Sequence, residues 1–394
     1  MSIIKNLIIL SGTMGVGKTA VARSLQKKLP SCVMLDGDWC WDMSPFLVTE
    51  ETRSMVMDNI THLLRNFLQC SALENIIFCW VIHEQQILDD ILNRLHDIPF
   101  QLWSFSLVCS EESLRSHILQ DVQNGIRTED VLKRSLPRLP LYEKVASRKI
   151  DVSNRTVEQT AEILTEFIQE TSPIEAVIFD MDGLMFDTER VCALAFDYVG
   201  EKMGIGKAGY MNLRTLGINE QQSSQIWKEE FGDDFDLKHF RELVRNFTEQ
   251  YFEEHSFPVK PGLFELLDFL EEHQIPFAVA SSSKESTVRR HLDRVGITSR
   301  FAAIVCGDQV SRSKPAPDIF LKTCSILGKD PAFCAVLEDS RNGLWAAANA
   351  GCYPIMIPDL WQCDSQTSLF LSVKFNSLSD AIPWFSTKLS YKIN

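Results

Sequence analysis

The sequence lacks three features that would place it in whole classes of protein. It has no run of about 18 apolar residues, so we expect no membrane-spanning helix. Its 53 acidic residues outnumber its 39 lysines and arginines, and the formal net charge of -14 argues against a large nucleic-acid surface. Its 11 cysteines include no Cys-x-x-Cys pair, which argues against a zinc site and a disulfide framework. We therefore expect a cytoplasmic protein with neither membrane nor nucleic acid as a partner.

The length and the order of patterns indicate more than one domain. At 394 residues the chain exceeds one ordinary hydrophobic core, and its 45% apolar and 23% charged content is typical of a globular protein. Residues 171–173 are the one short breaker between two α/β patterns. We predict a first domain at residues 1–170, a second core at residues 174–186 and 260–394, and a helical cap at residues 187–259. The oligomeric state stays open.

A glycine loop follows the first predicted strand. Residues 6–10 favour a buried strand, and the next stretch matches the pattern Gly-x4-Gly-Lys-Thr at every fixed position. Glycines let backbone N–H groups curl around phosphate oxygens, the lysine supplies a cation, and the threonine hydroxyl can bind Mg2+. The residues that we expect to bind ATP here are Gly12, Gly15, Val16, Gly17, Lys18 and Thr19, with Thr19 also on the metal.

The second predicted strand, at residues 32–35, ends in two acids. Asp36 and Asp38 follow it, separated by one glycine. Small-molecule kinases with this phosphate loop, which this stretch resembles, place carboxylates here: one can help to hold Mg2+, and another can take the proton from an acceptor hydroxyl. We prefer Asp38 as this base, with Asp36 on the metal and as the second choice of base; a helix cap or a turn is the alternative. Trp39 and Trp41 would line an acceptor pocket or belong to the core.

A lid and one missing acid complete the first pattern. Strands alternate with helices up to about residue 170, which predicts a doubly wound parallel sheet. The predicted strand at residues 75–82 ends without a Walker B aspartate, so Asp36 or Asp38 must support the metal instead. Arg127 and Arg134 would cover the phosphates of ATP from a lid, or they lie on the solvated face of a surface helix.

With this glycine loop, these paired acids and these lid arginines, residues 1–170 resemble the P-loop kinases of small molecules. That group includes shikimate, gluconate and adenylylsulfate kinases and chloramphenicol phosphotransferase. The resemblance implies an ATP-binding domain that phosphorylates a small molecule. Nothing in this half of the sequence names the acceptor.

The second pattern is built around two acids separated by one residue. Residues 176–179 predict a buried parallel strand, and Asp180 and Asp182 follow it, with Gly183 next. Side chains alternate along a strand, so we expect the two carboxylates on the same side, near enough to share a divalent cation. A capped strand end followed by a turn is the simpler interpretation.

Three later stretches carry groups of the kind that bind phosphate or metal. Ser281 and Ser282 follow a predicted strand, and Lys314 precedes a Pro-Ala-Pro stretch whose stiffness would help to aim its ammonium group. Glu338 and Asp339 end a further predicted strand. A hydroxyl, a cation and additional carboxylates are what a Mg2+-dependent phosphoryl site needs.

With these four stretches in this order, residues 174–360 resemble the haloacid-dehalogenase superfamily of phosphohydrolases, and within it the beta-phosphoglucomutase-like group with a helical cap. The resemblance implies a second doubly wound parallel core and a small phosphorylated metabolite as the substrate. It implies the following roles: Asp180 as the nucleophile, Asp182 as the acid and base, Ser281, Ser282 and Lys314 on the phosphate, and Asp180, Asp182, Glu338 and Asp339 on Mg2+.

Two further stretches carry weaker signals. Within the predicted cap, residues 212–217 interrupt the helical periodicity, and in the resembled group this loop helps to select the substrate. Arg214 is therefore a candidate for binding a second charged group on the substrate; a surface turn is the alternative. Residues 361–394 predict a peripheral helix with a frayed end.

These patterns leave several functions open. The first is a two-activity enzyme, an ATP-dependent small-molecule kinase joined to a Mg2+-dependent phosphatase. The second keeps the phosphatase as the catalyst and makes the first half a nucleotide-sensing module, which the missing Walker B aspartate favours. The third is a phosphomutase, in which a second hydroxyl accepts the phosphoryl group instead of water. A non-enzymatic scaffold would leave two sets of phosphate-handling residues idle.

Overall fold

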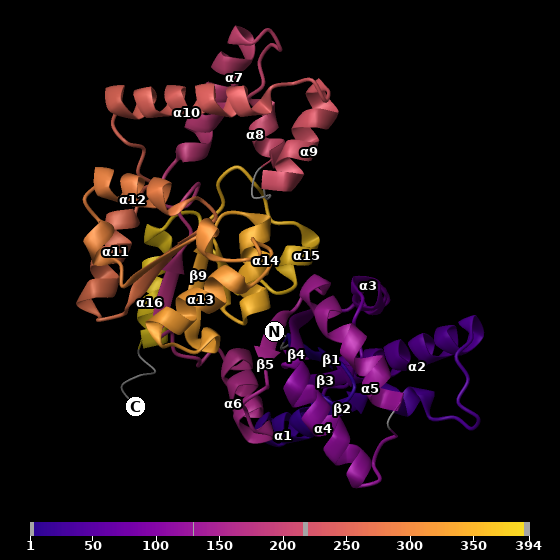
Figure 1. Ribbon diagram of the computed structural model, residues 1–394. Helices are drawn as coiled ribbons and strands as arrows, with labels where there is room; N and C mark the ends of the chain where they lie inside the picture. The colour runs from indigo at the N-terminus through magenta and orange to yellow at the C-terminus, as the bar shows by residue number, and fades with distance from the viewer. Residues whose placement is uncertain (1–3, 129, 216–219, 390–394) are drawn as a thin grey trace. The chain divides into compact units, whose positions relative to one another are not determined.

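The computed structural model describes residues 4–128, 130–215 and 220–389. The chain divides into two compact units, Met1–Ser172 and Pro173–Asn394. Each unit is an α/β fold around a parallel sheet, which confirms the predicted fold class (Figure 1). No described helix combines the length and the apolar composition needed to cross a bilayer.

The first unit contains a five-stranded sheet in the order β2-β3-β1-β4-β5. Its strands are β1 (Lys5–Gly12), β2 (Cys32–Asp36), β3 (Asn75–Trp80), β4 (Phe100–Val108) and β5 (Arg148–Asp151). Its α-helices are α1 (Lys18–Lys28), α2 (Glu50–Gln69), α3 (Gln85–Asn93), α4 (Glu111–Gln123), α5 (Asp130–Ser135) and α6 (Val157–Ile168). Two 3-10 helices, η1 (Gly37–Trp41) and η2 (Leu136–Lys144), complete the unit.

Strand β1 lies at the centre of this sheet and leads into the glycine loop. It pairs in parallel with β3 on one side and β4 on the other. Both of its faces are covered, and the side chains from Leu7 to Leu10 are almost fully buried, as expected of a central parallel strand. Helix α1 begins at Lys18, directly after Gly17, which adopts a left-handed conformation with φ of 97°. The loop between them therefore lies at the carboxyl end of the sheet, where α/β folds bind ligands.

The second unit contains a six-stranded sheet in the order β11-β10-β9-β6-β7-β8. Its strands are β6 (Ala176–Phe179), β7 (Phe277–Ser281), β8 (Ala303–Cys306), β9 (Cys334–Glu338), β10 (Tyr353–Met356) and β11 (Val373–Lys374). Its α-helices are α7 (Thr188–Lys202), α8 (Tyr210–Thr215), α9 (Glu220–Phe231), α10 (Leu237–Glu254), α11 (Leu263–Glu272), α12 (Glu285–Arg294), α13 (Asp318–Leu327), α14 (Arg341–Ala350), α15 (Ser365–Ser368) and α16 (Ile382–Leu389). Its 3-10 helices are η3 (Thr298–Arg300), η4 (Gly307–Gln309), η5 (Pro331–Phe333) and η6 (Ser379–Ala381).

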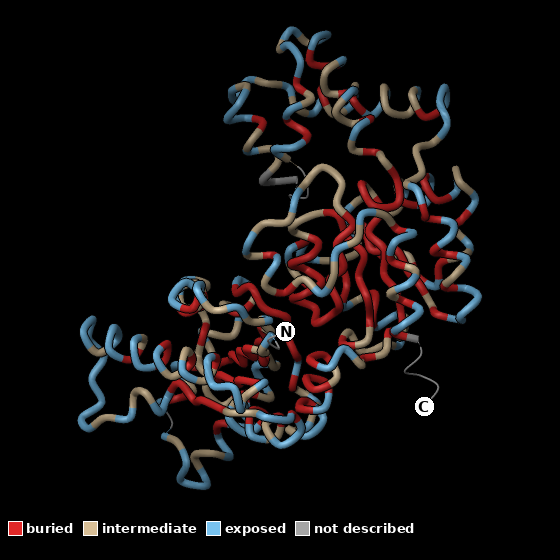
Figure 2. The backbone as a smooth tube through the Cα atoms, turned by 180° about the vertical axis from the view of Figure 1, so that it is seen from behind, coloured by how far each residue is buried: buried red, intermediate tan, exposed pale blue. Residues whose placement is uncertain are grey.

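Helices α13 and α14 cover one face of this second sheet. Ile178 of β6 and Val336 of β9 lie in one buried cluster with Phe320 of α13 and Ala347 of α14. Figure 2 shows that the strands of this sheet are mostly buried, whereas the helices around them have exposed outer faces. The core thus holds the strand ends in fixed positions.

Helices α7 to α10 form an insertion between β6 and β7 with its own hydrophobic core. Trp227 of α9 is the largest fully buried side chain there, and its ring lies 4.6 Å from that of Phe240 in α10. The two connections to the sheet run together: Phe186 forms an antiparallel bridge with Val259, and the N–H of Lys260 donates to the carbonyl of Met185. This is the predicted helical cap.

The end of the chain differs from the single peripheral helix that the sequence predicts. Residues 361–389 contain the short helix α15, the two-residue strand β11, η6 and α16. Strand β11 pairs with β10 and adds an edge to the sheet. Two residues are too few to show the alternation that identifies a strand, so the pattern could not reveal it. Residues 390–394, the predicted frayed end, lie outside the described residues.

Candidate functional site

In the second unit, the register of the central strands brings two acids together. Phe179 of β6 lies opposite Leu337 of β9, and the N–H of Asp180 donates to the carbonyl of Leu337 across 3.1 Å. Asp180 directly follows β6, and Glu338 is the last residue of β9. Both acids therefore lie at the carboxyl ends of two neighbouring strands. Both side chains are buried, with 7% and 1% of the residue surface exposed.

Lys314 reaches this edge from the loop before α13. Its Nζ lies 2.5 Å from Oδ1 of Asp180 and 2.7 Å from Oε1 of Glu338, and it donates to the carbonyl of Ala280 at 3.1 Å. Burial alone would lower the pKa of Lys314, but the two carboxylates raise it above its ordinary range. Lys314 is therefore a buried, charged group in contact with Asp180, although its loop follows β8, which lies two strands away from β6 in the sheet.

Three carboxylates at this edge form a group that fits a divalent metal ion. One oxygen each of Asp180, Glu338 and Asp339 lies within 4.8 Å of the other two, and all three residues are buried. Burial raises the pKa of Asp180 to about 8. The positive charge of Lys314 opposes this rise, and the negative charge of Glu338 adds to it. Burial and both neighbouring acids raise the pKa of Asp339 well above its usual range. Oxygen ligands under such mutual repulsion suit Mg2+, which would neutralise them.

Two glycines make room for this group of acids. A Cβ on Gly183 would lie 2.3 Å from Oδ2 of Asp339, and a Cβ on Gly343 would lie 1.7 Å from Oε1 of Glu338. The other oxygen of Glu338 accepts hydrogen bonds from the N–H and the hydroxyl of Ser340, at 2.9 and 2.8 Å. The positions of the carboxylates are therefore fixed by close packing against backbone.

The side chain of Asp182 is held apart from that group. Its Oδ1 accepts a hydrogen bond of 2.8 Å from the hydroxyl of Thr188, and its Oδ2 accepts one of the same length from Ser283. Its carboxylate is not among the three that lie within metal-binding distance of one another in the described residues. The predicted role of Asp182 on the metal stays a prediction.

Thr188 and Ser283 are contacts of Asp182 that sequence analysis did not identify. Ser283 is the second residue after β7, which ends at Ser281, and its N–H donates to Oγ of Ser281 at 3.1 Å. Ser281 is buried and Ser282 is exposed. Both hydroxyls were visible in the sequence within the motifs, but only the fold shows which oxygen each one contacts. The phosphate-binding roles of Ser281 and Ser282 stay predictions.

Arg214 of the cap forms an ion pair with Glu230 and approaches the sulfur of Met211 at 3.7 Å. Its role toward a substrate stays a prediction, and Leu216 and Gly217 of the same loop lie outside the described residues. The neighbouring Asn212 donates to a carboxylate oxygen of Glu189 at 3.0 Å. Burial raises the pKa of Glu189 to about 7, and the charge of Asp182 adds to this rise.

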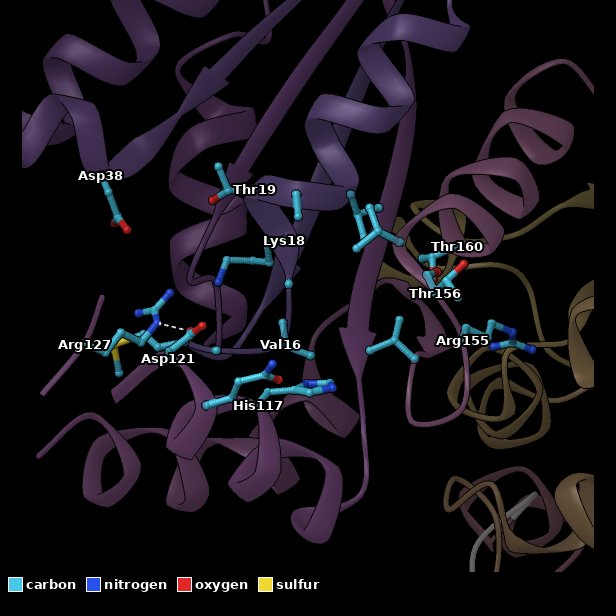
Figure 3. Close-up of a pocket in the computed structure, with 18 residues that line it drawn as sticks. Val16, Lys18, Thr19, Asp38, His117, Asp121, Arg127, Arg155, Thr156 and Thr160 are labelled. Carbon is cyan, nitrogen blue, oxygen red and sulfur yellow. Dashed lines mark hydrogen bonds and ion pairs between the residues drawn. The ribbon is translucent and has the colours of Figure 1, made fainter. Parts of the chain in front are cut away.

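In the first unit, the glycine loop borders a cavity of about 470 Å³ (Figure 3). The predicted residues Gly15, Val16, Gly17, Lys18 and Thr19 all line it, together with Arg127. In the view, Lys18, Thr19, Asp38 and Arg127 lie toward one side, and Arg155, Thr156 and Thr160 lie on the other. Arg155 and Thr156, from the loop before α6, were not identified from the sequence, because a loop after an edge strand carries no motif of its own.

The acids after β2 contact the predicted metal-binding threonine. The hydroxyl of Thr19 donates to Oδ2 of Asp36 at 2.8 Å, and the N–H of Asp38 donates to Oδ1 of Asp36 at 3.1 Å. Asp36 is buried, and the residue opposite it on the neighbouring strand β3 is Cys79. Strand β3 therefore supplies no carboxylate beside Asp36. Asp36 therefore occupies the place from which a carboxylate can support a metal ion on Thr19.

A second cavity, of about 630 Å³, adjoins the first at Asp38. Asp38 and Met14 line both cavities. Partial burial and the Asp36 carboxylate raise the pKa of Asp38, while Lys18 opposes the rise. Arg134 lines this second cavity and forms an ion pair of 2.8 Å with Asp130. Of the two predicted lid arginines, Arg127 thus belongs to the first cavity and Arg134 to the second.

The fold and the site make the second unit an α/β domain with an inserted helical cap and a group of buried carboxylates at the carboxyl ends of its strands. It follows, in the chain, an α/β domain with a phosphate loop. The chain belongs to the haloacid dehalogenase-like hydrolase family, whose model matches residues 177–357. A model described as an AAA domain matches residues 8–134.

Three curated relatives show the extent of the likeness. The chain is 33% identical to a phosphorylated carbohydrates phosphatase from Thermotoga maritima, over 45% of this chain and 82% of the relative. It is 30% identical to a beta-phosphoglucomutase from Bacillus subtilis, over 46% of this chain and 82% of the relative. It is 32% identical to a bifunctional riboflavin kinase/FMN phosphatase from Arabidopsis thaliana, over 52% of this chain and 53% of the relative. These relatives confirm the predicted likeness to beta-phosphoglucomutase-like proteins.

Proposed function

We propose that the second unit is a Mg2+-dependent phosphatase that acts on a small phosphorylated metabolite through an aspartyl phosphate on Asp180. The observation that carries this proposal is the contact of 2.5 Å between Lys314 and Asp180 at the carboxyl ends of buried parallel strands. A carboxylate attacks a phosphate only where nearby cations cancel the repulsion between them. The first two relatives support the substrate class, since their names refer to phosphorylated carbohydrates and to phosphoglucose.

The hydrogen bonds of the two aspartates support a different role for each. Asp180 attacks phosphorus in line, and Lys314 balances the charge of the phosphate. Asp182 gives a proton to the leaving alkoxide and later takes one from the attacking water, so one carboxyl group serves both steps. Thr188 and Ser283 each hold one oxygen of Asp182 and so fix its direction. Mg2+, when bound by Asp180, Glu338 and Asp339, supplies further positive charge to the phosphate oxygens.

We also propose that the first unit transfers a phosphoryl group from ATP to the hydroxyl of a small molecule. The supporting observation is that Thr19 contacts Asp36, while Asp38 stands where the two cavities meet. ATP in the first cavity would place its terminal phosphate near Lys18 and Arg127. An acceptor in the second cavity would give its proton to Asp38. Mg2+ at Thr19 and Asp36 would offset the charge of the phosphates.

One experiment with crossed controls tests both activities. We expect the full chain with Mg2+ to release phosphate from p-nitrophenyl phosphate and to consume ATP in the presence of suitable acceptors. Asp180→Asn should lose phosphate release and keep ATP consumption, and Lys18→Ala should do the reverse. Phosphate release that survives Asp180→Asn contradicts the nucleophile. ATP consumption that survives Lys18→Ala contradicts the kinase site, and its absence from the parent chain across a wide panel of acceptors favours a nucleotide sensor.

A phosphomutase is the second candidate for the second unit, because one relative is named a beta-phosphoglucomutase. Both reactions begin with the same aspartyl phosphate, and they differ in whether water or a hydroxyl of the sugar accepts it. Phosphorus NMR of a reaction with beta-glucose 1-phosphate separates them. Free phosphate as the product supports the phosphatase, whereas a second sugar phosphate supports the mutase.

A further inference from the structure

The side chains that line the second cavity of the first unit indicate the chemistry of its ligand, which the phosphate loop does not. The cavity volume of about 630 Å³ is that of a site for a small molecule. Its wall is formed by η1, the start of α2, the end of β3, α3 and the α5–η2 segment, and each contributes a different kind of side chain. The inference below rests on the proposed kinase function, because it concerns the acceptor.

One wall is made of aromatic rings. The ring of Trp41 lies 5.9 Å from that of Phe46 and 6.5 Å from that of Trp80, and all three line the cavity. Trp80 is fixed from behind, since a Cβ on Gly37 would lie 2.5 Å from its Cγ. Trp41 donates its indole N–H to the carbonyl of Leu47 at 3.3 Å. These rings are therefore held as a surface on which a flat, apolar group can lie.

Part of that wall is exposed to solvent. Phe46 is 62% exposed and Val48 is 49% exposed, although both line the cavity. Exposed apolar area costs free energy that a bound apolar group would recover.

Two of the three arginines that line the cavity have no acidic partner among the described residues. Arg53, Arg134 and Arg138 line it, and Arg134 is paired with Asp130. Asp38, Glu84 and Asp90 also line it; Glu84 lies 3.5 Å from His83, and Asp90 accepts a hydrogen bond from Gln86. In the part of the chain that the structure describes, neither Arg53 nor Arg138 forms an ion pair with a carboxylate, and the contact recorded for Arg138 is with Met14 Sδ at 4.0 Å. A guanidinium group is suited to bind a carboxylate by two parallel hydrogen bonds. Two such groups beside an aromatic wall favour an anionic ligand.

We propose that the acceptor is an aromatic hydroxy acid, a flat ring that bears a carboxylate and, directly or through a methylene group, a hydroxyl. The ring lies against Trp41 and Trp80, and the carboxylate binds Arg53 and Arg138. The hydroxyl oxygen at Asp38 forms the new bond to the γ-phosphorus of ATP. The proton of the hydroxyl goes to Asp38, and the bond from the γ-phosphorus to the bridging oxygen breaks to release ADP. Mass and charge balance with no further reactant.

Binding to the full chain, measured by calorimetry without nucleotide, tests the ligand class separately from catalysis. The probes are 4-(hydroxymethyl)benzoate, its methyl ester, and the cyclohexane analogue of the acid. We expect the acid to bind at least about tenfold more tightly than the ester, which lacks the charge, and than the saturated analogue, which lacks the flat ring. Equal binding of the three probes, or tighter binding of either control, overturns the inference.

Variants locate the site on the same probes. The double variant Arg53→Gln, Arg138→Gln should remove the preference for the acid over the ester, and each single variant should reduce it. Trp41→Leu should lower the affinities for the acid and for the ester by the same factor, so that the ratio of the two affinities is unchanged. Arg115→Gln, an exposed arginine of α4 paired with Glu111, is the matched control and should change nothing. A double variant that keeps the full preference overturns the assignment, provided that its thermal unfolding shows it folded; otherwise the single variants decide.

The two proposals fail in distinguishable ways. If the acid binds with the expected preference and its hydroxyl is not phosphorylated by ATP, the ligand class stands and the kinase proposal is wrong. If ATP phosphorylates neutral aliphatic alcohols and the aromatic acid does not bind, the kinase proposal stands and the ligand class is wrong.

Discussion

Nζ of Lys314 lies 2.5 Å from Oδ1 of Asp180, in an ion pair that the core of the second unit removes from solvent. The same ammonium group also contacts Glu338, so one cation faces two anions. Asp339 lies within metal-binding distance of both acids. Without a divalent ion the folded state must either keep excess negative charge or take up protons at the raised pKa values of Asp180 and Asp339, and both cost free energy in a buried site.

Asp180→Asn should therefore separate activity from stability. Asparagine has the same shape but no charge, so Lys314 keeps its contact with Glu338 while the repulsion falls. We expect no measurable phosphate release, and a melting temperature in the absence of divalent ions that rises by about 2–4 °C, the shift that ~1 kcal/mol produces in a unit of this size. A fall in the melting temperature would show that the attraction between Lys314 and Asp180 outweighs the repulsion among the acids.

Removing the groups that hold Asp182 should lower the rate more than the affinity. Thr188→Val and Ser283→Ala each leave one oxygen of Asp182 without its hydrogen-bond donor. Because the carboxyl group must point at the leaving oxygen during the reaction, we expect kcat for p-nitrophenyl phosphate to fall about tenfold per variant, with KM nearly unchanged. Ser368→Ala, which removes an exposed hydroxyl on α15, is the control. A rise in KM alone would assign these two hydroxyls to substrate binding.

Much of the fold was predictable because parallel strands buried on both faces give continuous apolar runs. Residues 176–179 and 334–338 show such runs, and the acids that follow them mark the strand ends. The glycine loop was predictable because few backbone arrangements can wrap around a phosphate. The two-residue strand β11 was missed, since pairing at a sheet edge needs no pattern in the sequence.

The finer geometry of the sites could not be predicted in the same way. The contact of Ser283 with Asp182 depends on how two segments 101 residues apart meet. The contact of Thr188 with Asp182, six residues before it, depends on how the loop between β6 and α7 folds. The division of Arg127 and Arg134 between two cavities depends on which way a short lid segment turns. Such contacts are set by tertiary packing, which the spacing of residues in one sequence does not record.

Two glycines with similar backbones provide a matched test of the carboxylate packing. Gly183 and Gly296 both have positive φ, of 81° and 72°, so an alanine is strained at either position. A Cβ at Gly183 collides with Asp339, whereas among the described residues other than its chain neighbours none has an atom within 4 Å of a Cβ at Gly296. We expect Gly296→Ala to destabilise the unit and to keep its phosphatase activity. Gly183→Ala should release phosphate at least about tenfold more slowly than Gly296→Ala. Equal effects on activity would show that backbone strain, and not the displacement of Asp339, is responsible.

ATP binding in the first unit should depend on pH through the ammonium group of Lys18. Burial lowers the pKa of Lys18 to about 8, against the opposing charges of Asp38 and Asp36. In the empty site the ammonium group therefore loses its proton as the pH rises through about 8, which is below the value of 10.5 for a free lysine. The triphosphate of ATP attracts the charged form, so its binding should raise the pKa of Lys18 and take up a proton.

The sign of the effect follows from this linkage. Below the pKa of the empty site, Lys18 is already charged and the affinity should not depend on its titration. Above it, each unit of pH makes protonation of Lys18 costlier, so the affinity should fall by up to about tenfold per pH unit. Calorimetry at pH 8.5 in two buffers of different ionisation enthalpy measures the proton uptake directly. In Lys18→Arg the guanidinium group stays charged between pH 7 and 9. We therefore expect the affinity of this variant for ATP to stay nearly constant over that range. An affinity of the parent chain that is equally flat would show that Lys18 stays charged in the empty site.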